Sequence, residues 1–127
     1  MDELLEQFLI EGPELVEQAG ADLLALEQRP ADTALIDSAF RAVHTLKGSV
    51  GLFDLKPMGA VLHRAEDLLD EIRQGRAAVT TQRIDRLLAV VERCGAWLEV
   101  LAREGDLDES ADDESSTTGR RPRPPVR

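Results

Sequence analysis

Apolar side chains recur every three or four residues along four stretches of the chain, with polar residues between them. This spacing places the apolar side chains of each stretch on one face of an α-helix. The predicted helices cover about residues 2–27, 32–50, 54–75 and 80–103. Their predicted buried positions are Leu5, Phe8, Val16, Ala19, Leu23, Leu26, Ile36, Ala39, Val43, Leu46, Val50, Leu55, Met58, Leu62, Ala65, Leu69, Ile72, Ile84, Leu87, Val91, Cys94, Leu98 and Leu101.

Residues with strong local preferences mark the ends of these helices. Gly12-Pro13 interrupts the first pattern, because proline lacks an amide hydrogen and clashes with the preceding turn. A kinked helix and two successive helices both fit that pattern. Asp32, Asp54 and Thr80 are placed to accept hydrogen bonds from the first amides of the next three helices.

Short connections between four such helices predict an all-α, up-down-up-down four-helix bundle over residues 1–103. The composition agrees, since 43% of the residues are hydrophobic but only 3% are aromatic, a mixture that favours helices over a sheet. A chain of 127 residues is long enough for one core and short for two.

Charge and cysteine content narrow the class of protein further. The net charge of −10 argues against nucleic-acid binding. There is no apolar run long enough for a membrane span and no basic start typical of a signal peptide. The single cysteine, Cys94, has no internal disulfide partner. We therefore expect a cytoplasmic protein that does not insert into membranes.

Residues 104–127 have a different character, because acidic residues are followed by Ser, Thr and Gly and then by a basic, proline-rich run. No apolar periodicity remains in this stretch. The composition predicts a disordered, flexible linker. We expect it to lead to a missing remainder of a longer protein.

His44 and its surroundings are the candidate site. Lys47 lies one turn from His44, and Gly48 and Gly51 follow at positions where glycine weakens a helix by about 1 kcal/mol. In an antiparallel hairpin that turns near residue 53, His44 and His63 lie at one level, and Glu66 lies one turn beyond His63. We therefore expect two imidazoles, an ammonium and a carboxylate in one patch.

Such a patch suits a phosphoryl acceptor. A neutral imidazole has one lone-pair nitrogen, and a carboxylate bonded to the other nitrogen decides which one stays free. Glu66 is the candidate carboxylate, and Lys47 offers a positive charge to an incoming anion. A lone histidine at the edge of a helix is, however, more often a plain surface residue.

The residues around His44 resemble the phosphorylation-site helix of histidine phosphotransfer domains, most closely the P1 domain of the chemotaxis kinase CheA. His63, Glu66 and the run Leu68-Leu69-Asp70-Glu71 follow at the spacing of that family without a gap. Ser49 and Asp54 stand where CheA commonly has glycine. The matching segment is Ala39-Phe40-Arg41-Ala42-Val43-His44-Thr45-Leu46-Lys47-Gly48-Ser49-Val50-Gly51-Leu52-Phe53.

The resemblance implies that His44 is the phosphorylated residue and that Glu66, Lys47 and His63 support it. It also implies that partner proteins dock at Gly48, Ser49, Gly51 and Arg41.

By the same resemblance, a CheA-type kinase domain, in the same polypeptide or on another chain, transfers phosphate from ATP to His44. A CheY- or CheB-like receiver then takes the phosphate onto an aspartate. ATP and Mg²⁺ belong to those partners. The fragment itself is expected to be a monomeric carrier rather than an autonomous enzyme. The resemblance also implies a location at chemoreceptor clusters.

Three alternatives are weaker. A di-metal bundle needs paired Glu-x-x-His motifs, and only the reversed His63-x-x-Glu66 is present. The dimerisation hairpin of a sensor kinase normally has an acidic residue after its histidine, where this chain has Thr45. A helical adaptor that carries no phosphate is the third alternative.

Overall fold

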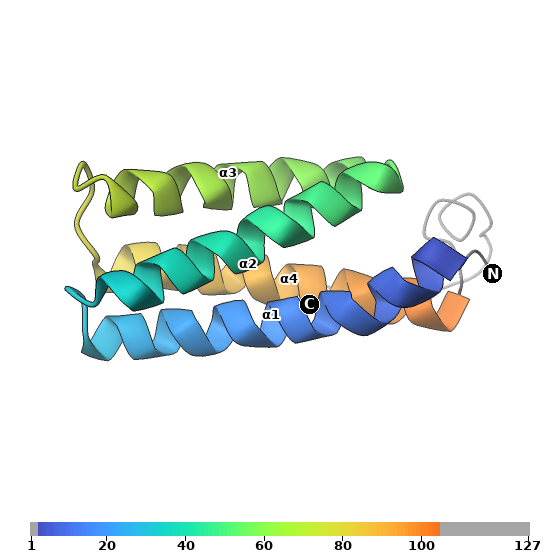
Figure 1. Cartoon of the computed structure of the whole chain (residues 1–127), viewed down its shortest axis with the longest axis horizontal. Helices are drawn as coiled ribbons and strands as arrows, with labels where there is room; N and C mark the ends of the chain where they lie inside the picture. The colour runs from blue at the N-terminus through green and yellow to red at the C-terminus, as the bar shows by residue number, and fades with distance from the viewer. Residues whose placement is uncertain (1–2, 105–127) are drawn as a thin grey trace.

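The computed structural model describes residues 3–104, which form four α-helices and no strand. They are α1 (Glu3–Gln28), α2 (Thr33–Leu52), α3 (Lys56–Arg73) and α4 (Thr81–Glu104). The α2–α3 turn lies at one end of the bundle, and the α1–α2 and α3–α4 connections lie at the other (Figure 1). The predicted all-α, up-down-up-down bundle is confirmed. The predicted linker lies outside the described residues, apart from Glu104, which ends α4.

Two of the three predicted helix caps are present. Asp32 accepts hydrogen bonds from the amides of Ala34 and Leu35, at 3.1 and 3.3 Å, and so caps α2. Thr80 Oγ1 accepts one from the amide of Arg83 at 3.1 Å.

The prediction that Asp54 caps α3 is wrong. Asp54 has a φ of +57° and turns the chain between α2 and α3, and Leu55 is the residue that precedes the first turn of α3. Leu55 is buried in the core. No side chain of the described residues caps the start of α3, and the residue at that start, Leu55, is instead held in the core.

Helix α1 continues through Pro13 as a single helix, so the alternative of two successive helices is wrong. Gly12 is buried here, and a Cβ atom at this position would lie 3.0 Å from Cδ1 of Leu98 on α4. Close packing of the two helices thus explains the glycine that precedes the proline. Similarly, α2 extends past Gly51 to Leu52 rather than ending near Val50.

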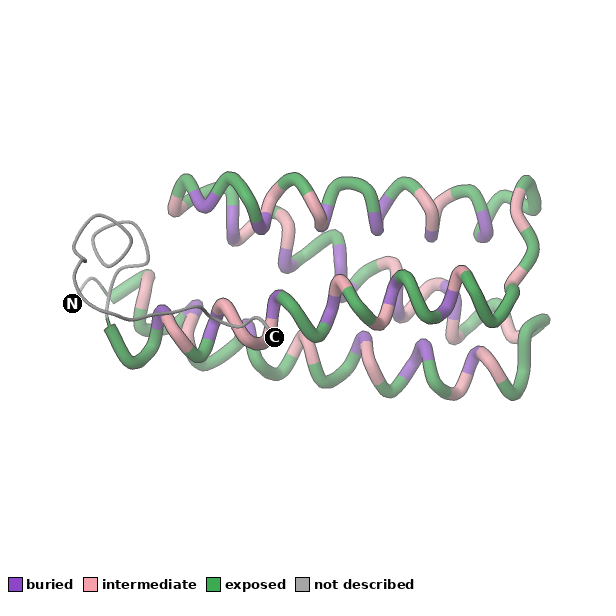
Figure 2. The backbone as a smooth tube through the Cα atoms, turned by 180° about the vertical axis from the view of Figure 1, so that it is seen from behind, coloured by how far each residue is buried: buried purple, intermediate pink, exposed green. Residues whose placement is uncertain are grey.

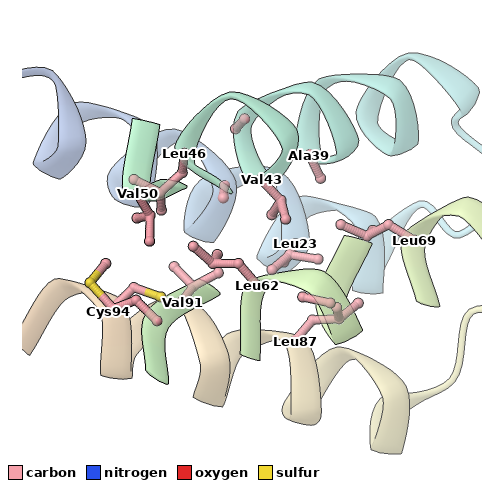
Figure 3. Close-up of a cluster of buried hydrophobic side chains, with 14 of the residues drawn as sticks. Leu23, Ala39, Val43, Leu46, Val50, Leu62, Leu69, Leu87, Val91 and Cys94 are labelled. Atoms are coloured by element: carbon pink, nitrogen blue, oxygen red, sulfur yellow. The ribbon is translucent and has the colours of Figure 1, made fainter. Parts of the chain in front are cut away.

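The core consists of one apolar face from each helix, as the periodicity predicts (Figure 2). Every position expected to be buried is buried except Leu5 and Val16, which are half-buried and pack against the core. Figure 3 shows side chains from all four helices meeting along the axis of the bundle. This continuous packing fixes α2 against α3, the two helices that carry the candidate site.

A buried polar cluster formed by Gln18, Asp22 and Ser38 joins α1 to α2. The carboxyl group of Asp22, only 7% exposed, accepts a 2.5 Å hydrogen bond from the Ser38 hydroxyl. It also accepts from the Gln18 side-chain amide at 3.1 Å. These bonds offset part of the cost of removing a carboxyl group from water.

The thiol of Cys94 lies in the core with no exposed surface. Burial raises its pKa to about 12, so the thiolate, the reactive form, is scarce at neutral pH. Within residues 3–104, no helix combines the length and apolar character needed to cross a bilayer.

Candidate functional site

Glu66 of α3 lies between two side chains of α2. Its Oε2 atom contacts Nδ1 of His44, and its Oε1 atom forms an ion pair with Nζ of Lys47. The carboxylate side chain is only 11% exposed, whereas the His44 side chain is 61% exposed. The predicted contacts of Glu66 with His44 and Lys47 are therefore present.

The charge state of Glu66 follows from these contacts. Burial acts to raise its pKa, but the hydrogen bonds and charges of Lys47 and His44 outweigh this effect and hold the pKa below its ordinary value. Glu66 is therefore ionised at neutral pH. An ionised carboxylate can only accept hydrogen bonds, so Nδ1 of His44 must carry the proton and donate it.

This arrangement leaves the second ring nitrogen of His44 as the reactive atom. When the ring is neutral and Nδ1 is protonated, Nε2 carries the lone pair. No residue within 3–104 forms a hydrogen bond with Nε2, and the side chain is mostly exposed. The site can thus present an oriented nucleophilic nitrogen to a group that arrives from solvent.

The ring of His44 contacts an aromatic residue, Phe40, that the sequence pattern does not mark as functional. The ring of Phe40 stacks on the imidazole, with centroids 5.9 Å apart and planes 8° from parallel. The guanidinium of Arg73 lies 4.1 Å from the centroid of the Phe40 ring. An aromatic residue four positions before a histidine on one helix is the signal that could have revealed this contact.

His63 is not part of this cluster in the way the sequence predicts. Its Nε2 atom lies 3.5 Å from Oδ2 of Asp67 on the same helix, and its side chain is 63% exposed. Within the described part of the chain, no polar contact joins it to His44 or Glu66. The expected contact between the two imidazoles is therefore absent within residues 3–104, and a supporting role for His63 stays a prediction.

Helix geometry explains why Glu66, rather than His63, contacts His44. Side chains lean toward the N-terminus of their own helix. On α2 this carries the His44 ring away from the α2–α3 turn, and on α3 it carries side chains toward that turn. The partner of His44 must then start farther from the turn than His63 does, and Glu66 has that position.

The surface beside His44 is open at both predicted small residues. A Cβ atom at Gly48 or at Gly51 would meet nothing within 4 Å. Arg41 is exposed and Ser49 is half-buried. Packing therefore does not require glycine at either position, and a partner surface could approach them closely.

A metal site is not evident in the described region. Within residues 3–104, no group of three or more His, Cys, Asp or Glu side chains is placed to hold a metal ion.

The comparison with known families decides the class of this bundle. The family model described as "Hpt domain" matches residues 3–97. The chain belongs to the Hpt domain family. Among curated proteins, this Hpt domain is 40% identical over 108 residues to the "Chemotaxis protein CheA" of Halobacterium salinarum. That match covers 85% of this chain but only 16% of the relative.

Solved structures agree with this assignment. The Hpt domain superposes on the CheA phosphotransferase domain from Thermotoga maritima with a TM-score of 0.75 and 31% identity, covering 80% of this chain and 99% of that one. It also matches the phosphorylated P1 domain of CheA3, solved in complex with CheY6 from R. sphaeroides, with a TM-score of 0.75 and 29% identity. The latter match covers 86% of this chain and 89% of the other.

Proposed function

We propose that this Hpt domain carries phosphoryl groups on Nε2 of His44 within a CheA-like chemotaxis or two-component kinase. The observation that carries the proposal is the exposed His44 ring whose Nδ1 is held by a buried, ionised Glu66. That contact leaves Nε2 both accessible and unprotonated in the neutral ring.

In the first step, the Nε2 lone pair attacks the γ-phosphorus of ATP, a new N–P bond forms, and the bond to the ADP oxygen breaks. The ring keeps its proton on Nδ1 and gains positive charge as the bond forms. The carboxylate of Glu66 lies next to that proton and stabilises the developing charge. The ammonium of Lys47, paired with the same carboxylate, adds positive charge close to the incoming phosphate.

In the second step, an aspartate carboxylate of a receiver attacks the phosphorus, and the N–P electron pair returns to Nε2. His44 is then a neutral imidazole again, with Nδ1 still bonded to Glu66. The domain supplies an oriented carrier atom in both steps. Its partners would supply the nucleotide, the Mg²⁺ and the acceptor aspartate.

The partners we propose are a CheA-type ATP-binding kinase domain and a CheY- or CheB-like receiver. The chain spans about a sixth of the length of its Halobacterium salinarum relative, so the kinase would lie elsewhere in the same polypeptide or on another chain. The similar P1 domain of CheA3 was solved in complex with CheY6, which supports a receiver as the second partner. A four-helix bundle folded from one chain also favours a monomeric carrier over a two-helix dimerisation hairpin.

The test is phosphorylation of the purified chain by a CheA kinase that lacks its own phosphotransfer domain, using ATP labelled at the γ-phosphorus. Phosphoramidate serves as a chemical donor that requires no matching kinase. We expect label that is lost in acid and kept in base, on His44 in the wild-type chain and absent in His44→Gln. His63→Gln is the matched control, because the chain has two histidines.

Label that survives in His44→Gln and disappears in His63→Gln would show that His63 is the carrier and would overturn the proposal for His44. A wild-type chain that takes no label from either donor would favour a helical adaptor. Transfer of the label to an added receiver, measured as loss from His44 and gain on the receiver, tests the second step.

A further inference from the structure

Three side chains from two helices form a stack that ends at the His44 ring. Arg73 of α3 covers one face of Phe40, at 4.1 Å from the ring centroid. Phe40 in turn stacks on His44 with an angle of only 8° between the planes. Asp70 fixes the guanidinium through a 2.8 Å hydrogen bond with Arg73. The order is thus Asp70, Arg73, Phe40, His44.

The Phe40 contact restrains a motion that the Glu66 hydrogen bond does not. A hydrogen bond at Nδ1 fixes the direction of that atom, but the imidazole can still tilt about the line from Nδ1 to the carboxylate. A parallel ring stacked on the imidazole opposes this tilt, because tilting would break a stacked contact that stabilises an aromatic pair beyond its burial. Together, Glu66 and Phe40 restrain both the direction of Nε2 and the plane of the ring.

The other side of the stack shows why Phe40 can hold its place. Phe40 is half-buried and packs against the core, and the guanidinium of Arg73 lies over its ring. A cation over an aromatic face is attracted to it. Because Arg73 belongs to α3 and Phe40 to α2, the stack also links the two helices that carry the site.

We propose that Phe40 is a positioning residue for phosphoryl transfer, holding the plane of the His44 ring while Arg73 holds Phe40 in place. This inference rests on the proposed function of His44 as the phosphoryl carrier. The nucleophilic nitrogen must point along the line of attack on phosphorus, so a ring that tilts freely spends less time in the reactive orientation.

The experiment compares the wild-type chain with Phe40→Leu, Phe40→Tyr and Arg73→Ala. Leucine keeps apolar bulk at position 40 but removes the ring, and tyrosine keeps the ring. Phe53→Leu is the matched control, because Phe53 is also half-buried and stacks on Phe8, with centroids 5.1 Å apart, rather than on His44. NMR measures the chemical shifts of the His44 ring protons, and labelling by phosphoramidate measures the rate.

We expect Phe40→Leu to move the His44 ring-proton signals and to slow labelling about two- to tenfold, the size expected when one side chain loses its restraint. Phe40→Tyr should keep the His44 signals and the labelling rate close to those of the wild type. Arg73→Ala should change both in the same direction as Phe40→Leu, but by less. Phe53→Leu should leave the His44 signals and the labelling rate unchanged.

Equal labelling rates in Phe40→Leu and the wild type would overturn the positioning role alone, because labelling of His44 itself would still occur. An equal slowing in Phe53→Leu would also overturn it, since general loss of packing would then explain the effect. A wild-type chain that takes no label would overturn the proposed function and the positioning role with it.

Discussion

Oε2 of Glu66 accepts a hydrogen bond from Nδ1 of His44 across the interface of α2 and α3, although the two residues are 22 positions apart in the chain. The acceptor is buried and the ring is exposed. A buried group thus sets the orientation of an exposed one, because the carboxylate is held by its helix while the imidazole projects into solvent.

Replacing Glu66 by alanine should slow phosphorylation of His44 about tenfold to a hundredfold. This corresponds to the loss of about 1.5–3 kcal/mol from a hydrogen bond to a charged group. The rate of labelling from phosphoramidate measures the effect.

Glu71→Ala is the matched control for Glu66→Ala, since Glu71 is an exposed glutamate on the same helix. Its labelling rate should match that of the wild type. Thermal unfolding followed by circular dichroism should show that Glu66→Ala still folds. An unchanged rate in Glu66→Ala would remove this carboxylate from the mechanism.

Replacing Lys47 by methionine should raise the pKa of Glu66. Burial already acts to raise that pKa, and Lys47 provides the first of the opposing hydrogen bonds. NMR titration of the Glu66 side-chain carboxyl carbon measures the value in each chain. In the wild type it should lie below the ordinary 4.5, and a value in Lys47→Met at or below that of the wild type would contradict the prediction.

The same shift predicts how stability depends on pH. Because the folded-state pKa of Glu66 is lowered, its contribution to the free energy of unfolding is present above the unfolded pKa and is lost as pH falls through the folded pKa. The difference in unfolding free energy between the wild type and Glu66→Gln should therefore shrink as pH falls below 4.5. Urea unfolding at a series of pH values measures it.

Gly48→Ala should stabilise the bundle by about 0.5–1 kcal/mol, because alanine favours a helix interior over glycine. A Cβ atom at Gly48 meets nothing within 4 Å, so no clash opposes the gain. Gly12→Ala should gain less, since its Cβ would lie 3.0 Å from Cδ1 of Leu98. Urea unfolding of the two variants tests the contrast.

Gly48→Leu should fold at least as stably as the wild type but slow phosphoryl transfer from the kinase or to the receiver. The leucine side chain would project from the open surface beside His44, where a partner must approach. Labelling by phosphoramidate, a small donor, should be affected much less than labelling by the kinase. Unaltered transfer with both protein partners would show that neither contacts position 48.

Ser38→Ala should destabilise the bundle by about 1–3 kcal/mol, because it removes a donor from the buried carboxyl group of Asp22. The phosphorylation rate should stay unchanged. Gln7→Ala is the control, since the 2.9 Å hydrogen bond of Gln7 to Glu11 is exposed. Equal unfolding free energies in the two variants would show that the Asp22 cluster adds nothing to stability.

The sequence predicts the fold well because one physical signal, the helical spacing of apolar residues, governs most of it. Leu62, Leu69 and Leu87 lie in the core as that spacing requires. The start of α3 was less predictable. Aspartate is a residue type typical of helix caps, but Asp54 adopts a positive φ in the turn. Leu55 then enters the core before the helix begins.

The site was only partly predictable for a related reason. The periodicity gives the face of each residue, so Glu66 could be matched with His44 and Lys47. It gives no direct measure of how far a side chain leans along its helix, and this lean makes Glu66, rather than His63, the residue that bonds to His44. The Phe40 stack depends on side-chain rotamers, which the apolar pattern does not specify.

The sealed thiol of Cys94 makes the chain convenient for site-specific labelling. A cysteine introduced in place of Gly48 or Gly51, both exposed, would react with a maleimide dye at neutral pH, whereas the native thiol would not. A fluorophore could therefore be attached beside His44 without first removing the natural cysteine, and its emission could follow partner binding in real time.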